Sequence, residues 1–285
     1  MSGIAGNSRS SARLWLHVWE QCQMHGSVQR ALLLLAGAEP QSPVETLATL
    51  SIGQRNRRLL ALRESLFGPG FVGLATCPQC GERIEMTFAA SEISQAMASI
   101  QRSDAGITGS PEVDSEGGEH GATTPSSLVA IEDRYLWSDS SFEVIYRLPT
   151  SQDLMALDPA HGSGARRKQL LDRCILESRS DGVNVAPDQL PSEVSAAVVA
   201  HMAAVDPFAL METDLICSAC EYRWPVQFDI LSFLWDELNA WAERMLNEVH
   251  TLASAYGWSE MEILDMGPWR RGRYISMVLD RGAVT

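Results

Sequence analysis

The sequence predicts a mostly helical α+β fold with a four-cysteine β-hairpin core that is interrupted by a long α/β insertion. Apolar residues recur at helical spacing near both ends of the 285-residue chain. Two C-x-x-C pairs each precede a short alternation of apolar and polar residues, which is typical of a strand. The 136 residues between the pairs carry strand and helix patterns of their own, which indicates an insertion.

The N-terminal region, residues 1–76, is predicted to be helical. Apolar residues recur at helical spacing over 12–36, with a break at 25–27, and again from Ser51 to Arg63. The last of these helices is expected to place its leucines on one face and its arginines on the other.

Two segments of similar pattern follow. Cys77-Pro-Gln-Cys80-Gly81 and Cys217-Ser-Ala-Cys220 each lead into an apolar–polar alternation. Each is predicted to be a cysteine-bearing turn that precedes a strand. We therefore assign residues 77–90 and 208–228 to one discontinuous module.

The four cysteines of this module form the donor set of a tetrahedral Zn²⁺ site. They are Cys77, Cys80, Cys217 and Cys220. Each tight turn brings two thiolates to one ion, so the module is predicted to be zinc-ribbon-like. Four thiolates leave no position for water or a substrate, and the predicted Zn²⁺ is therefore structural.

A redox role and unligated or disulfide-bonded cysteines remain the alternatives. A redox C-x-x-C pair is expected at a helix N-terminus, where the dipole lowers the thiol pKa, whereas both pairs here precede strands. The usual separation between zinc-ligand pairs is about 15 to 20 residues, which the insertion exceeds. The other two cysteines, Cys22 and Cys174, fall in helical patterns and are expected in the core.

The long segment between the cysteine pairs has two parts. An acidic flexible linker is predicted over 91–127, because 103–127 holds five acidic and no basic residues. The α/β insertion is predicted over 128–207. The expected strands cover 127–136 and 142–148, the expected helices cover 151–157, 165–178 and 191–204, and a strand over 208–216 returns to the second cysteine pair.

The C-terminal region, residues 229–285, is also predicted to be helical. Its longest helix carries one wide apolar stripe and ends at Tyr256-Gly257. Ser259 and Glu262 have the spacing of a capping box, and Gly267-Pro268 begins the last helix.

The composition is that of a globular protein. Its 45% hydrophobic and 20% charged residues exclude collagen-like, coiled-coil and fully disordered classes. The strongest apolar run, 31–38, is too short to span a bilayer, and no secretory signal follows the first 13 residues. We therefore expect a cytoplasmic protein without membrane contact.

The charges and aromatic residues favour a protein partner. A net charge of −14, from 22 basic and 36 acidic side chains, argues against broad nucleic-acid binding. Two clusters of arginines and an excess of tryptophans near the C-terminus are typical of protein interfaces. The predicted partner-binding residues are Arg55, Arg58, Trp258, Trp269, Arg270 and Arg271. Solvated helix faces paired with carboxylates, and core packing of the tryptophans, are the alternatives.

Catalytic motifs are absent from the sequence. It contains no H-E-x-x-H, G-x-S-x-G, Walker or dinucleotide-binding glycine motif. The six histidines are scattered without metal-ligand spacing. We therefore expect no catalytic residues and no enzymatic activity.

Several segments together carry a resemblance to a known family. They are Ser51–Glu64, Cys77–Gly81, Cys217–Cys220 with Trp224 and Phe228–Ile230, His250–Glu260, and Arg270–Tyr274. In these segments the chain resembles the baseplate-type proteins encoded in the gene clusters of contractile injection systems. Those proteins are similar to the baseplate hub assembly chaperones of contractile-tailed phages.

The resemblance implies a non-enzymatic assembly chaperone or component for the baseplate of a phage-tail-like contractile injection system. The implied partners are baseplate or hub subunits. A zinc-ribbon nucleic-acid-binding regulatory protein is the alternative, and a thiol–disulfide oxidoreductase with two cysteine pairs is a third hypothesis.

Overall fold

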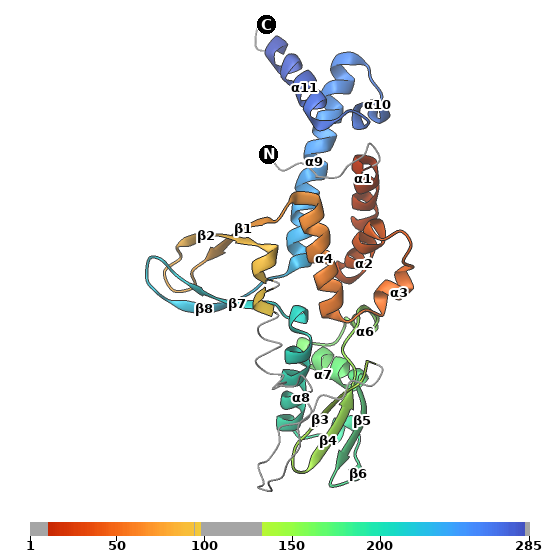
Figure 1. The fold of residues 1–285 in the computed structure, drawn as a ribbon, viewed down its shortest axis with the longest axis vertical. Coiled ribbons are helices and arrows are strands. Elements are labelled where there is room, and N and C mark those ends of the chain that lie inside the picture. Colours follow the sequence, from red (N-terminus) through yellow and green to blue (C-terminus); the bar gives the residue numbers. More distant parts are fainter. Residues whose placement is uncertain (1–10, 94, 98–132, 283–285) are drawn as a thin grey trace, which may run out of the picture. The chain divides into compact units, whose positions relative to one another are not determined.

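A computed structural model describes residues 11–93, 95–97 and 133–282 (Figure 1). Helices and small antiparallel sheets make up the described chain, which confirms the predicted α+β class. The chain divides into two units. Unit 1 comprises Met1–Ala48, Arg55–Glu92 and Glu212–Thr285, and unit 2 comprises Thr49–Gln54 and Ile93–Met211. Each unit is therefore assembled from segments that are far apart in the sequence.

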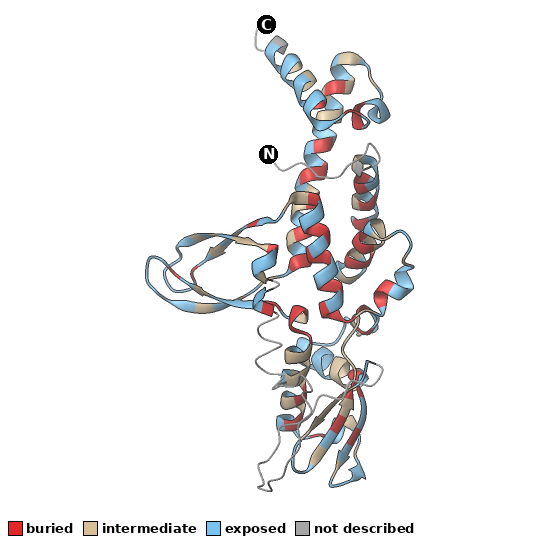
Figure 2. Ribbon diagram, viewed as in Figure 1, coloured by how far each residue is buried: buried red, intermediate tan, exposed pale blue. Residues whose placement is uncertain are grey.

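The helices before the first hairpin bury the apolar stripes that predicted them. They are α1 (Ser11–Cys22), α2 (Ser27–Ala38), α3 (Val44–Ala48) and α4 (Ile52–Phe67). Leu32, Leu35 and Leu59 are almost inaccessible to solvent. Figure 2 shows buried positions in red along these helices. The helices predicted over 12–36 and from Ser51 onward are confirmed.

Two arginines of α4 do not lie on a solvated face: Arg55 is buried, and Arg63 is only 2% exposed. The guanidinium of Arg63 makes two hydrogen bonds of 2.6 Å to the carboxylate of Glu237. It also donates to the carbonyl oxygen of Gly68 at 2.7 Å and lies 3.8 Å from the ring centroid of Phe71. The bidentate hydrogen bonds to the carboxylate and the contact with the aromatic ring replace the hydration that the guanidinium loses on burial.

The three predicted C-terminal helices are confirmed, although the short helix ends at Leu264 rather than at Met266 and the last one extends past Leu279 to Gly282. They are α9 (Ile230–Tyr256), α10 (Glu260–Leu264) and α11 (Pro268–Gly282). Asp229 caps α9 by accepting hydrogen bonds from two backbone N–H groups of the first turn, and Gly257 ends it with a φ of 68°. Ser259 and Glu262 form the predicted capping box of α10. These capping signals depend only on neighbouring residues, so the sequence alone is enough to predict them.

Two antiparallel β-hairpins belong to unit 1. The first pairs β1 (Gly70–Thr76) with β2 (Arg83–Ala89), and the second pairs β7 (Glu212–Ile216) with β8 (Arg223–Gln227). Figure 1 shows the two hairpins side by side. Strand β1 was not among the predicted strands. Apolar residues occupy both of its faces, which hides the alternation that marks a half-buried strand.

A cluster of phenylalanines joins the two hairpins at the ends of the strands away from the turns. The rings of Phe71 and Phe88 stack with centroids 5.1 Å apart, and Phe228 meets them edge-on at 5.7 and 5.5 Å. Phe233 of α9 lies 5.2 Å from Phe71. Each aromatic pair contributes about 0.5–1.5 kcal/mol beyond the area it buries. The cluster therefore ties both hairpins to α9.

Unit 2 contains a four-stranded antiparallel sheet with the strand order β3-β4-β5-β6. Its strands are β3 (Tyr135–Ser138), β4 (Phe142–Tyr146), β5 (Ile175–Ser180) and β6 (Val183–Asn184). Its helices are α6 (Ser151–Met155), α7 (Ser163–Cys174) and α8 (Ser192–Val205). Two 3₁₀ turns complete the unit, η1 (Pro187–Gln189) and η2 (Pro207–Ala209). Val144, Tyr146, Ile175, Val194 and Val198 contribute to its core.

Two elements predicted near this unit are partly wrong. The helix predicted over 165–178 ends at Cys174, because Ile175 pairs with Tyr146 and begins β5. The strand predicted over 208–216 begins instead with the 3₁₀ turn η2, and only its second half is a strand. In both cases the tertiary environment overrides a weak local pattern.

The predicted linker over 91–127 falls mainly outside the described residues. Residues 91–93 and 95–97 are helical, and 98–127 are outside the described part of the chain. The beginning of the strand predicted over 127–136 also lies outside the described residues. Of the described residues 133–136, only Tyr135 and Leu136 belong to β3, which continues to Ser138.

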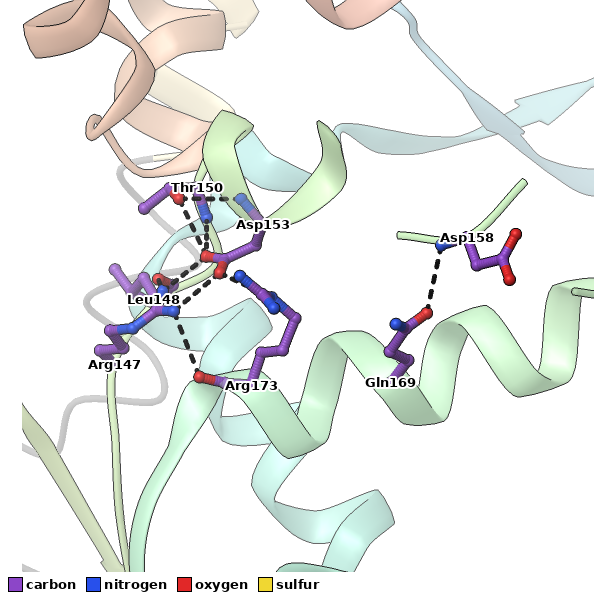
Figure 3. Close-up of polar contacts among 7 residues, drawn as sticks. All are labelled: Arg147, Leu148, Thr150, Asp153, Asp158, Gln169 and Arg173. Atoms are coloured by element: carbon purple, nitrogen blue, oxygen red, sulfur yellow. Dashed lines mark hydrogen bonds and ion pairs between the residues drawn. The ribbon is translucent and has the colours of Figure 1, made fainter. Parts of the chain in front are cut away.

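Asp153 is the centre of a polar network in unit 2 (Figure 3). Its side chain is 3% exposed and accepts hydrogen bonds from both terminal nitrogens of Arg147, at 2.6 and 2.7 Å, and from Nε of Arg173 at 3.2 Å. The backbone N–H and the hydroxyl of Thr150 also donate to it. Burial by itself would raise the pKa of Asp153, but these donors outweigh it and hold that pKa well below its usual range.

Replacing Asp153 by Asn is expected to lower the free energy of unfolding by about 2 kcal/mol at neutral pH, because two guanidinium groups lose their carboxylate. The folded pKa of Asp153 lies below its unfolded value of about 3.9. The stabilisation is therefore present above that value and is lost as the pH falls below it.

Urea unfolding at neutral pH and at about pH 3 measures this effect. The difference between Asp153→Asn and the wild-type chain should shrink at the lower pH. Asp158→Asn is a matched control, because Asp158 is half-exposed and lies outside the network. A difference that stays constant with pH would contradict the prediction.

Candidate metal centre

Each C-x-x-C pair lies in the turn between the two strands of a hairpin, and the two turns have the same backbone hydrogen bonds. In the first turn, the N–H of Cys77 donates to the carbonyl oxygen of Glu82 at 2.8 Å, and the N–H of Gly81 donates to that of Cys77 at 2.9 Å. In the second turn, Cys217 and Glu221 take the places of Cys77 and Gly81, with two bonds of 2.9 Å. The turns are therefore structural repeats.

The two turns bring four cysteines together from opposite ends of the insertion. The sulfur atoms of Cys77, Cys80, Cys217 and Cys220 all lie within 4.8 Å of one another. Two of the separations between the hairpins are 3.5 Å, between Cys80 and Cys217, and 3.7 Å, between Cys77 and Cys220. Cys77 and Cys217 are buried, whereas Cys80 and Cys220 are exposed. This cluster could hold one metal ion.

The thiols of the cluster influence one another's ionisation. Burial opposes ionisation of Cys217, but backbone N–H groups of Ala219 and Cys220 and neighbouring thiols donate to it and lower its pKa to about 7. For Cys220, the backbone N–H of Tyr222 favours the thiolate, yet partial loss of hydration and the adjacent sulfur atoms together raise its pKa to about 12. The negative charge of one thiolate thus disfavours ionisation of a second thiol nearby. A bound cation would neutralise this repulsion and favour the thiolate form of all four cysteines.

The remaining two cysteines lie apart from this cluster, as the sequence predicted. Cys22 and Cys174 are fully buried. Burial raises the pKa of each thiol to about 11. Both are therefore core residues with inert thiols.

The predicted partner-binding arginines fall in different environments. Arg55 is buried and donates to the side chain of Asn56 at 3.1 and 2.9 Å. Arg271 is also buried; it pairs with Glu248 and donates to the carbonyl oxygen of Met266 at 3.1 Å. Arg55 and Arg271 thus serve the interior of unit 1, and their guanidinium groups are not accessible to a partner.

Arg58 and Arg270 are exposed, in contrast to the other two arginines. Arg58 forms a surface ion pair with Glu39 at 2.7 Å. Arg270 lies in the first turn of α11. These two positions remain compatible with binding a partner.

The two predicted partner-binding tryptophans also differ. Trp258 is half-buried, stacks on Tyr256 with ring centroids 4.5 Å apart, and meets Tyr274 edge-on at 4.9 Å. It therefore fastens α11 to the end of α9. Trp269 is 82% exposed at the beginning of α11. Trp269 is the tryptophan that a partner could reach.

Sequence reasoning missed two features of the centre, β1 and the left-handed backbone at Glu221. The φ angle of Glu221 is 59°, and that of Gly81 is 78°. Aligning the two cysteine pairs places Glu221 opposite Gly81, the residue type that adopts such an angle most easily. That alignment is the signal that could have identified the turn conformation from the sequence.

Comparison of the chain with family models, with curated proteins and with solved structures found no match in any of the three. Within the described parts of the chain, no helix combines the length and the apolar character needed to cross a membrane.

Substitutions at Glu221 and Gly81, which both have positive φ angles, should change the free energy of unfolding in opposite directions. Glu221→Gly should raise the free energy of unfolding by about 1 kcal/mol, because a residue with a Cβ atom is strained in this conformation. Gly81→Ala should lower it by about the same amount at the equivalent position of the other turn. Urea unfolding measures the free energy of unfolding of both variants. If both variants changed it in the same direction, the two turns would not be conformationally equivalent.

Proposed function

We propose that this chain is a non-enzymatic assembly chaperone or component for the baseplate of a phage-tail-like contractile injection system. In this proposal a structural Zn²⁺ stabilises unit 1, and the exposed end of α11 binds other baseplate subunits. The observation that carries the proposal is the convergence of four cysteines from both ends of the insertion. The resemblance of the sequence to baseplate-type proteins supplies the biological setting.

The donor set fits Zn²⁺. Thiolates are soft ligands and bind this ion at about 2.3 Å, which separates the sulfur atoms of a regular tetrahedron by about 3.8 Å. Two of the separations, 3.5 and 3.7 Å, are close to that value, and all of them lie within 4.8 Å. Four thiolates would complete the coordination sphere, which leaves no position for catalysis by the ion.

The placement of the ligands supports a structural role. Each hairpin supplies one pair of thiols, and the two pairs are 136 residues apart in the sequence. The ion would therefore join two segments that are otherwise tied through the phenylalanine cluster at the other ends of the strands. Binding free energy at such a site becomes folding free energy.

Trp269 and Arg270 support the binding of a protein partner. Tryptophan and arginine dominate the energetics of protein interfaces, because they combine a large contact area with directional polar groups. Both residues lie exposed in the first turn of α11. Nucleic-acid binding is less well supported, because Arg55, Arg63 and Arg271 are buried and cannot neutralise phosphates.

The metal proposal predicts one Zn²⁺ per chain in protein purified without chelator. Cys77→Ser should remove the ion and lower the melting temperature, whereas Cys22→Ala should keep it. A chelator should lower the melting temperature of the wild-type chain and of Cys22→Ala, but not that of Cys77→Ser. Metal analysis and thermal unfolding measure both effects; a wild-type chain without metal and insensitive to chelator would refute the zinc site.

The partner proposal predicts that Trp269→Ala weakens binding to co-expressed baseplate subunits of the same gene cluster by more than about tenfold. Leu279→Ala on the same helix is the matched control, because Leu279 is also well exposed. Co-purification and titration measure the effect. DNA binding that requires Arg270 and weakens steeply with salt would instead favour the regulatory alternative.

A further inference from the structure

The strands of the two hairpins differ in how their edges are protected. Each hairpin is a two-stranded sheet, so within the described residues every one of these strands has one unpaired edge. Charged residues and proline prevent such edges from pairing with other chains. They are present in β2 (Arg83, Glu85), in β7 (Glu212, Asp214) and in β8 (Arg223, Pro225). Strand β1 has neither, so no charged side chain or proline protects its edge.

Strand β1 also exposes two large apolar side chains. Val72 is 57% exposed and Leu74 is 63% exposed, and the two share one face of the strand because they are two residues apart. Phe71 points to the opposite face, where it is fully buried against Phe88 and Arg63. This burial holds Val72 and Leu74 outward, where they cannot join the core.

We propose that β1 pairs antiparallel with β1 of a second copy of this chain, about a twofold axis at Gly73. In this register Val72 lies opposite the partner's Leu74, and Gly70 lies opposite the partner's Thr76. All seven residues of the strand are then paired. The two hairpins form one sheet with the strand order β2-β1-β1-β2. This pairing is independent of the proposed function and of the partner surface on α11.

The distribution of charge favours the edge of β1 over the other strand edges for contact between two copies of the chain. Each chain carries a net charge of −14, so two copies repel each other over most approaches. A twofold interface brings the same strand of both copies together, so a strand whose charges all have one sign gathers that sign from both copies. Pairing through β7 would gather Glu212 and Asp214 of both copies, which is unfavourable. Strand β1 has no charge to repel and has Val and Leu placed symmetrically about Gly73.

The area buried by the pairing of two β1 strands is small, so the dimer is expected to be weak. Stable interfaces bury about 1,200–2,000 Å² in total, more than a single seven-residue strand edge can cover. We therefore expect a dimer that forms as the concentration rises and dissociates on dilution.

Two double variants at the same positions test the pairing and its register. Val72→Lys with Leu74→Lys places lysine opposite lysine across the axis, whereas Val72→Lys with Leu74→Glu places lysine opposite glutamate. Both sites are more than half exposed, so neither variant should unfold the chain. Val183→Lys is a matched control on an exposed valine in a strand of unit 2.

Sedimentation velocity of the full chain over a wide concentration range, with circular dichroism to verify folding, gives the result. The wild-type chain and Val183→Lys should dimerise with the same dissociation constant. The lysine–lysine variant should raise that constant by more than about tenfold, and the lysine–glutamate variant should restore much of the loss. The proposal is overturned if the wild-type chain stays monomeric, if the lysine–lysine variant still dimerises, or if the two double variants behave alike.

Discussion

Two β-hairpins that are far apart in the sequence are held together at both ends, and the rest of unit 1 depends on that contact. The four cysteines meet at the turns, and Phe71, Phe88 and Phe228 meet at the other ends of the strands. A two-stranded hairpin alone is at best marginally stable in water. Because each hairpin supplies half of the thiols, the cysteine centre cannot form in either hairpin alone.

The same contact explains why Arg63 is buried in this acidic protein. Arg63 lies on the ring of Phe71 and pairs with Glu237, so it connects α4 and β1 to α9. A buried ion pair is retained only when both charges are fully hydrogen-bonded, and the bidentate geometry meets that condition. Arg63, Arg55 and Arg271 thus belong to the interior, and fewer cations remain at the surface than the composition suggests.

The proposed assembly function would need a framework and a binding surface, and these would come from different parts of unit 1. The cysteine centre and the phenylalanine cluster make a framework. Trp269 has no such role, because it is exposed at the beginning of α11. Strand β1 combines both, since one face carries the buried Phe71 and the other exposes Val72 and Leu74. The proposed assembly function and the proposed self-pairing therefore use different surfaces of the same framework.

The sequence by itself determined whatever depends on neighbouring residues. The apolar stripe and ends of α9, the capping box at Ser259, and the spacing within each cysteine pair are of this kind. Only the tertiary structure decided β1, the change from helix to strand at Ile175, and the burial of Arg63. These features depend on partners distant in the sequence, namely β2, β4 and Glu237, and no local pattern encodes where such partners lie.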